Sequence, residues 1–304
     1  MAGIGSFAYV VGDAEGRPED IPGFEDLWRA VSPDTAFTAM GTGTYRKMTG
    51  PLVPYIVDCV AKVLSTHGVR AAEVDRLVLA TSDAVLGLLG RDVAVEVMRA
   101  AGLTACVPAI VSLQQCCSSL EALRYAWGLA GAEVGADARN VVLVALDFTP
   151  DDRDRVKSFA LFGDAVAGCL ISRDHGGLTL AGTGLAADFS GMVGQDTFAS
   201  RQAVARAALD QAFRQAGRVP GDVTKIFTSS LFAPIVSFNA MAAGQARELL
   251  HFQGPMTRYG HCGNADWLIN LMDHTDKSGR ERGALYLAQA SAPGFFACAL
   301  LEAG

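Results

Sequence analysis

Mostly apolar runs of strand length alternate with longer helix-like stretches along the whole chain, and this alternation limits the fold more than any other feature. The strand-like runs lie at 76–82, 140–148, 165–172, 224–232 and 282–291. Between them, stretches such as "YIVDCVAKVLSTHG" and "SRQAVARAALDQAFRQAG" end in Gly, as many helices do. Strands that are apolar on both faces need cover on both faces, so we predict a layered α/β fold.

The order of elements is also duplicated. The segments "LSTHGVRAAEVDRLVLATS" and "FRQAGRVPGDVTKIFTSS" each run from a helix end through Gly, a basic residue and an acidic residue into an apolar strand. The two segments lie roughly 150 residues apart, which is the length of a domain half and not of a solenoid repeat. We therefore predict two similar halves, residues 1–160 and residues 161–304.

Composition narrows the function classes. Half of the 304 residues are hydrophobic, and the net charge is −7, so we expect a large core and no nonspecific nucleic-acid binding. The N-terminus lacks the basic start and apolar stretch of a signal peptide, and no run approaches 18 apolar residues, so we predict no membrane partner. Seven cysteines with no C-x-x-C spacing indicate a reducing compartment and not a disulfide framework, and we predict a cytoplasmic protein.

Two adjacent cysteines, Cys116 and Cys117, stand where a strand end meets the predicted helix "SLEALRYAW". The positive end of a helix dipole favours a thiolate, and the thiolate is the nucleophilic form of cysteine. The alternative is that both are small packing residues, because free cysteine is among the most buried residue types.

A second candidate site is the segment "RYGHCGNAD", where glycines flank His261 and Asp266 follows five residues later. A turn at this spacing can return the carboxylate to the imidazole, fix its tautomer and support its charged form. The alternative is a capped helix with His261 bonded to the backbone. We do not predict a metal site from His261, Cys262 and Asp266, because no clear fourth ligand is present.

A third segment, "LFGDAVAG" at 161–168, has a Gly-Asp pair before a small-residue strand. Its spacing fits neither a P-loop nor a dinucleotide fingerprint, so we interpret it as a structural turn.

Together these motifs resemble the ketosynthase III branch of the thiolase superfamily. "QCCSSLEAL", "LFGDAVAG", "RYGHCGNAD" and the terminal "APGFFACALL" occur in that family's order and spacing. The resemblance covers essentially the whole chain. It implies a five-layered αβαβα fold of two similar halves, a homodimer and an acyl-thioester on an active-site cysteine, with no cofactor. The family places the nucleophile seven residues before a leucine that here is Leu123, which selects Cys116, with Cys117 as the alternative.

Four departures from the family pattern bear on function. Ser230 stands where condensing relatives carry a histidine, and His261 stands where they carry an asparagine. In the family that His/Asn pair stabilises an enolate. Near the C-terminus, where the family supplies a backbone N–H to the oxyanion hole, this chain has Pro293, which has no N–H, followed by Gly294. The residues ahead of the second-half helix, "GTGLAADFSGMVGQDTFASRQ", are shorter than the family's excursion, which suggests a more open site.

A Cys116–His261–Asp266 set with these departures resembles the ketosynthase III-like acyltransferases of natural-product pathways, including polyketide and antibiotic biosynthesis. The resemblance implies acyl transfer from an acyl carrier protein or acyl-CoA to the hydroxyl or amine of a small molecule. Two alternatives stay open: a decarboxylative condensing enzyme, and a noncatalytic partner subunit. Gly294 and Ser230 are candidates for the oxyanion hole or the pocket.

Overall fold

The computed structural model of the chain describes residues 2–131, 138–195 and 197–304. Strands cover β1 Gly3–Val11, β2 Ala14–Gly16, β3 Tyr45–Lys47, β4 Arg76–Ala80, β5 Val107–Val111, β6 Asn140–Asp147, β7 Ala165–Ser172, β8 Leu178–Ala187, β9 Val223–Phe227, β10 Leu250–His251, β11 Leu285–Ala292 and β12 Phe295–Ala303. Helices cover α1 Phe24–Val31, α2 Leu52–Ser65, α3 Asp83–Leu86, α4 Arg91–Ala100, α5 Ser118–Gly131, α6 Phe189–Met192, α7 Phe198–Ala216, α8 Ala233–Ala242, α9 Gln253–Tyr259 and α10 Asp266–Ser278.

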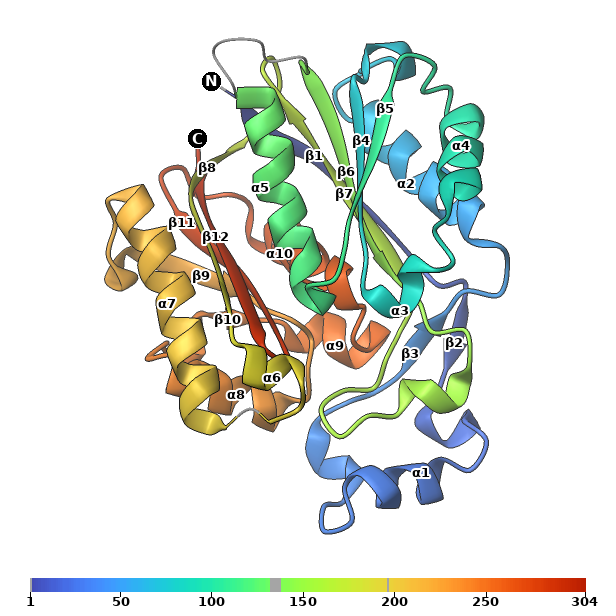
Figure 1. Ribbon diagram of the computed structural model, residues 1–304, viewed down its shortest axis with the longest axis vertical. Coiled ribbons are helices and arrows are strands. Elements are labelled where there is room, and N and C mark those ends of the chain that lie inside the picture. The colour runs from blue at the N-terminus through green and yellow to red at the C-terminus, as the bar shows by residue number, and fades with distance from the viewer. Residues whose placement is uncertain (1, 132–137, 196) are drawn as a thin grey trace.

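The main strands form two groups of five that meet at one point. Their order is β10-β9-β11-β12-β8-β1-β7-β6-β4-β5, and a single residue pair, Ile4 with Leu178, joins β1 to β8. Helices α5 and α10 lie between the two groups, with α2 and α4 outside one group and α7 outside the other (Figure 1). The predicted five layers are therefore present.

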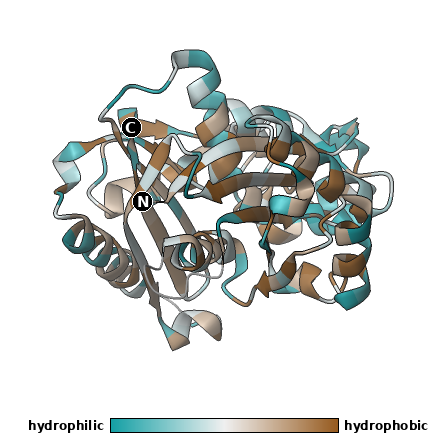
Figure 2. Cartoon of the chain, turned by 90° about the horizontal axis from the view of Figure 1, so that it is seen from above, coloured by the Kyte–Doolittle hydropathy of each residue, from teal (hydrophilic) through white to brown (hydrophobic). Residues whose placement is uncertain are grey.

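Strand β6 shows why the strands need cover on both faces. All eight of its residues are buried. Val141 and Leu143 pack in the central cluster with α5, while Val142 and Val144 pack in the outer cluster with α2. Successive side chains of a strand point to opposite faces, so an unbroken apolar run fits only between two helical layers. Figure 2 shows the apolar residues gathered along the strands and the hydrophilic ones on the outer helices and loops.

The predicted strand positions are confirmed with one difference in length. Four of the five predicted runs match β4, β6, β7 and β11 to within a few residues. The fifth run ends as β9 at Phe227, and Thr228–Phe232 continue as a loop. Strand β7 lies in the predicted second half of the chain but pairs with β1 and β6, which lie in the first half. The division into two similar halves at residue 160 therefore stays a prediction. Among the described residues, no helix is both long and apolar enough to cross a bilayer.

Candidate functional site

The segment before α5 makes a sharp turn that carries Cys116. A short 3-10 helix, Gln115–Cys117, leads directly into α5 at Ser118, so the predicted helix start beside the cysteines is confirmed. Leu113 and Gln115 adopt positive φ angles of 76° and 53°, a region that non-glycine residues rarely occupy. This turn places Cys116 ahead of the helix N-terminus, where partial positive charge favours an anion.

The two adjacent cysteines have different surroundings. Cys117 has no exposed surface, and its Sγ donates to the carbonyl of Ala290, 3.3 Å away on β11. Burial raises the pKa of the Cys117 thiol well above its usual value, which disfavours a thiolate there. Cys116 is partly exposed, and the other six cysteines are all buried. The geometry favours Cys116 over Cys117 as the nucleophile.

The backbone of His261 is held between α9 and the segment before β7. Its N–H donates to the carbonyl of Leu161 at 2.8 Å, and its carbonyl accepts from the N–H of Gly163 at 3.0 Å. Gly260, at φ 77°, is required there, since a Cβ would lie 2.7 Å from the oxygen of Leu161. The ring of Phe162 packs edge-on against the imidazole, with centroids 4.8 Å apart. These contacts fix the backbone of His261 and pack one side of its imidazole.

The three candidate catalytic side chains lie in one line of contacts. Cys116 Sγ lies 3.4 Å from His261 Nε2, and His261 Nδ1 lies 2.5 Å from Asp266 Oδ2. Asp266 also accepts from the N–H of Cys262 at 2.8 Å and from the N–H of Ser230 at 2.6 Å. The carboxylate is thus fixed on both oxygens and fixes the proton of His261 on Nδ1, leaving Nε2 toward the thiol.

The surroundings of His261 favour its charged form. Burial acts to lower the pKa of this imidazole, but the Asp266 carboxylate and then the Cys116 thiol raise it by more. The pKa of His261 therefore lies well above its usual value. An imidazolium beside a partly exposed cysteine can stabilise a thiolate.

Ser230 contacts Asp266, whereas Gly294 lies in the turn between β11 and β12. The N–H of Ser230 binds Asp266, and its Oγ accepts from Asn270 Nδ2 at 3.3 Å, so Ser230 supports the carboxylate. Pro293 and Gly294 form the two-residue turn between β11 and β12. Gly294 has φ 75°, and its carbonyl accepts from the N–H of Asp188 at 2.8 Å. Their part in an oxyanion hole stays a prediction.

The segment "LFGDAVAG" is a structural turn, as predicted. Asp164 is buried and accepts two hydrogen bonds from the buried guanidinium of Arg155, at 2.7 and 2.9 Å. It also accepts from the N–H groups of Met48 and Thr149. At Gly163 a Cβ would lie 1.8 Å from the oxygen of Tyr259. The turn therefore joins three segments and supports the backbone of His261.

Sequence reasoning missed two contributors to this site. Phe162 lies within the turn motif but gave no signal of its contact with His261. Asn264 stands within "RYGHCGNAD", and its side chain contacts the turn that carries Cys116. The available sequence signal was a polar amide residue between Gly263 and Ala265, two positions before the predicted orienting carboxylate.

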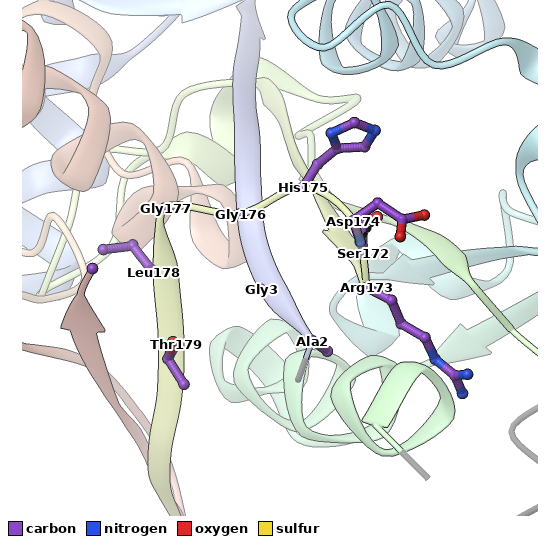
Figure 3. A pocket seen from close by; sticks show the side chains of 11 residues that line it. Ala2, Gly3, Ser172, Arg173, Asp174, His175, Gly176, Gly177, Leu178 and Thr179 are labelled. Carbon is purple, nitrogen blue, oxygen red and sulfur yellow. Dashed lines mark hydrogen bonds between the residues drawn. The ribbon is translucent and has the colours of Figure 1, made fainter. Parts of the chain in front are cut away.

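One surface hollow lies away from these residues. It has a volume of about 230 Å³ and is lined by Ala2, Gly3, Gly304 and the segment 172–179, which joins β7 to β8 (Figure 3). None of the candidate catalytic residues lines it. Its charged members include Asp174, which pairs with Arg139 at 2.6 Å.

Several solved structures are similar to this chain over nearly its full length. The acyltransferase ChlB3 matches with a TM-score of 0.80 and 17% identity, over 99% of this chain and 97% of that one. 3-Oxoacyl-acyl-carrier-protein synthase III from Aquifex aeolicus matches with a TM-score of 0.77 and 17% identity, over 99% and 100%. The priming β-ketosynthase of the R1128 polyketide pathway matches with a TM-score of 0.78 and 17% identity, over 100% and 96%. The chain has the ketosynthase III fold.

This confirms the thiolase-like fold expected from four motifs. No protein-family model matches the chain, and no curated protein sequence does. The ketosynthase III fold is shared here by a protein named as an acyltransferase and by proteins named as a synthase III and a ketosynthase. The fold alone therefore does not select the reaction, and the side chains at the site must.

Proposed function

We propose that this protein is an acyltransferase that carries an acyl group on Cys116 and passes it to a hydroxyl or amine. The observation that carries the proposal is the line of contacts from Cys116 Sγ through His261 to Asp266, at 3.4 and 2.5 Å. Such a line activates a nucleophile and can then deprotonate an acceptor.

In the first half-reaction the Cys116 thiolate attacks the carbonyl carbon of an acyl thioester. The bond from that carbon to the carrier sulfur breaks, and the carrier thiol leaves with the proton from His261 Nε2. The donor is an acyl carrier protein or acyl-CoA. The raised pKa of His261 suits this step, because the imidazolium is present at neutral pH to pair with the thiolate and to protonate the leaving sulfur.

In the second half-reaction the neutral imidazole accepts the proton of the acceptor. The acceptor oxygen or nitrogen attacks the acyl carbon, and the bond to Cys116 Sγ breaks, which restores the thiolate and the imidazolium. Acylation removes negative charge beside His261 Nε2, and that charge is one cause of its raised pKa. Loss of that charge lowers the pKa of His261, so a larger fraction of the imidazole is neutral and able to accept a proton in the acyl-enzyme than in the free enzyme. Asp266 holds its orientation throughout.

The first alternative is decarboxylative condensation, and two similar structures are named as a 3-oxoacyl-acyl-carrier-protein synthase III and a priming β-ketosynthase. One feature favours transfer to oxygen or nitrogen. Ser230 stands at the position expected for an enolate-stabilising histidine, and its N–H is engaged by Asp266. Pro293 removes an N–H from the turn at which the family supplies an oxyanion donor, and this departure keeps the noncatalytic alternative open.

An acyl-loaded preparation tests the reaction directly. The isolated acyl-enzyme is divided between a malonyl thioester and a panel of small alcohols and amines, and products and carbon dioxide are measured. Release of the acyl group as an ester or amide without carbon dioxide supports the proposal. A β-ketoacyl product with carbon dioxide identifies a condensing enzyme, and no loading with any donor favours the noncatalytic subunit.

We also propose a homodimer built on the edge strand β5. Val107 and Ile110 on this strand are 52% and 38% exposed, and Leu113 just beyond it is 66% exposed. The segment 107–113 contains no charged residue, and Pro108 removes only one N–H from the edge. An uncharged apolar edge strand has unpaired backbone N–H and C=O groups that can pair with another strand. We propose that β5 of a second copy of the chain is that strand.

A further inference from the structure

Asn264 is a fully buried side chain that lies between the two parts of the candidate site and has no role in the proton transfers above. It belongs to a short 3-10 helix, Gly263–Ala265, just before Asp266. Its Oδ1 accepts from the N–H of Ser119 at 2.8 Å, and its Nδ2 donates to the carbonyl of Gln115 at 3.0 Å. These two partners lie on either side of Cys116.

The amide of Asn264 is itself anchored to the end of strand β6. Its Nδ2 and its backbone N–H both donate to Asp147 Oδ2, at 2.9 and 2.8 Å. The other oxygen of this buried carboxylate accepts from the N–H of Ser82, after β4, at 2.9 Å. Gly263 permits the close approach, since a Cβ there would lie 2.0 Å from Asp147 Oδ2. Asp147 thereby ties Asn264 to the ends of two central strands.

The turn that Asn264 contacts is one that needs support. Leu113 and Gln115 hold positive φ angles of 76° and 53° just before Cys116. Such backbone conformations persist only where surrounding contacts hold them, and they gather at functional sites. The carbonyl that Asn264 binds belongs to Gln115, one of the two strained residues.

We propose that Asn264, anchored by Asp147, is a positioning residue that holds the turn bearing Cys116 at reacting distance from His261. The catalytic consequence rests on the proposed acyl transfer. The positioning itself does not, because the reactivity of the thiol can be measured without an acyl donor.

The test is the rate of alkylation of Cys116 by iodoacetamide between pH 5 and pH 9, followed by peptide mapping. The six other cysteines are buried, so labelling of the folded protein reports on Cys116. For Asn264→Ala we expect a rate about tenfold lower at pH 7, since a Cys116 displaced from the His261 imidazolium holds less of its thiol as thiolate. The difference should close at pH values where thiols ionise unaided, so the pH profile should move to higher pH.

Asn140→Ala is the matched control. Asn140 is also buried and lies at the opposite end of β6, where its Nδ2 donates to Glu73 and its Oδ1 accepts from Ser172 Oγ. We expect this variant to lower the melting temperature and to leave the alkylation rate unchanged. An equal loss of rate in Asn140→Ala would overturn the proposal, because the effect would then be general loosening.

Asp147→Asn is the second variant, and it changes shape very little. An amide offers one acceptor oxygen where a carboxylate offers two, so the anchor of Asn264 is weakened. We expect a smaller loss of rate in the same direction. Wild-type rates in both Asn264→Ala and Asp147→Asn, or a wild-type protein unlabelled at Cys116, would overturn the proposal. Normal alkylation with no acyl loading would contradict the proposed function alone.

Discussion

Cys116 and His261 lie 145 positions apart in the sequence, and each is placed by backbone contacts that have no part in bond making. The nucleophile depends on a strained turn, and the imidazole depends on the backbone of Leu161 and Gly163. Asp266 then fixes the tautomer of the imidazole. At the scale of single residues, substitutions at these positions can therefore test the role of each side chain in the acylation of Cys116 and in acyl transfer to the acceptor.

His261→Ala should slow acyl loading, because the Cys116 thiolate loses its imidazolium partner, and should slow transfer further. No group then accepts the proton of the acceptor, so we expect transfer to slow by about a hundredfold or more. Single-turnover kinetics with the isolated acyl-enzyme measure this step. Transfer at the wild-type rate would contradict the assignment of His261 as the base in the second half-reaction.

Asp266→Asn should change the pH dependence of the thiol. Among the groups that raise the pKa of His261, Asp266 has the largest effect, so the variant lowers that pKa. The imidazole of the variant therefore loses its proton as the pH rises toward neutrality. At pH 7 we expect iodoacetamide to label Cys116 about tenfold more slowly than in the wild type, with the difference closing at pH values where thiols ionise unaided. A rate that is unchanged at pH 7 would show that the carboxylate has no such influence.

The raised pKa of His261 also makes the free energy of unfolding depend on pH. The pKa of His261 is raised in the folded state, so its ion pair with Asp266 stabilises the fold below the usual imidazole range and is lost as pH rises through the folded-state pKa. The cost of Asp266→Asn in unfolding free energy should therefore be larger at pH 6 than at pH 10, by chemical denaturation.

At the scale of elements, the β11–β12 turn depends on a glycine. Gly294 has φ 75°, and a Cβ would lie 2.5 Å from the backbone nitrogen of Met192 on α6. Gly294→Ala should lower the unfolding free energy by about 2 kcal/mol or more, because backbone strain and a clash act together.

Gly244→Ala is the control for that substitution. Gly244 has a similar φ of 71°, but a Cβ there meets nothing within 4 Å. This variant should therefore carry the strain alone and lose less stability in urea unfolding. Equal losses in the two variants would mean that contact between the turn and α6 contributes nothing.

The sequence was sufficient to predict the buried strands, but it did not predict the side-chain contacts between distant segments. The runs that form β4, β6 and β7 are apolar enough to need cover on both faces, and this property alone identifies them as buried strands. The contacts of Phe162 and Asn264 depend on which turns the fold brings together, and no local pattern records that. His261 and Asp266 were accessible to sequence reasoning because only five positions and one turn separate them.

At the scale of the whole molecule, the exposed edge of β5 predicts the oligomeric state. We expect a dimer by light scattering, and we expect Ile110→Lys to shift it to the monomer, since a charge on an edge strand opposes pairing. Val219→Lys is the control, because Val219 is also exposed, at 59%, and lies just before β9 in the other group of five strands. A monomeric wild type, or an equal shift in both variants, would contradict the proposed interface.

The central claim is that Cys116 carries the acyl group. Intact-protein mass spectrometry after incubation with a panel of acyl-CoA and acyl-carrier thioesters, followed by peptide mapping, tests it most directly. We expect one acyl mass on Cys116, its complete loss in Cys116→Ala and its retention in Cys117→Ala. An acyl mass mapped to Cys117, or full loading of Cys116→Ala, would contradict the account.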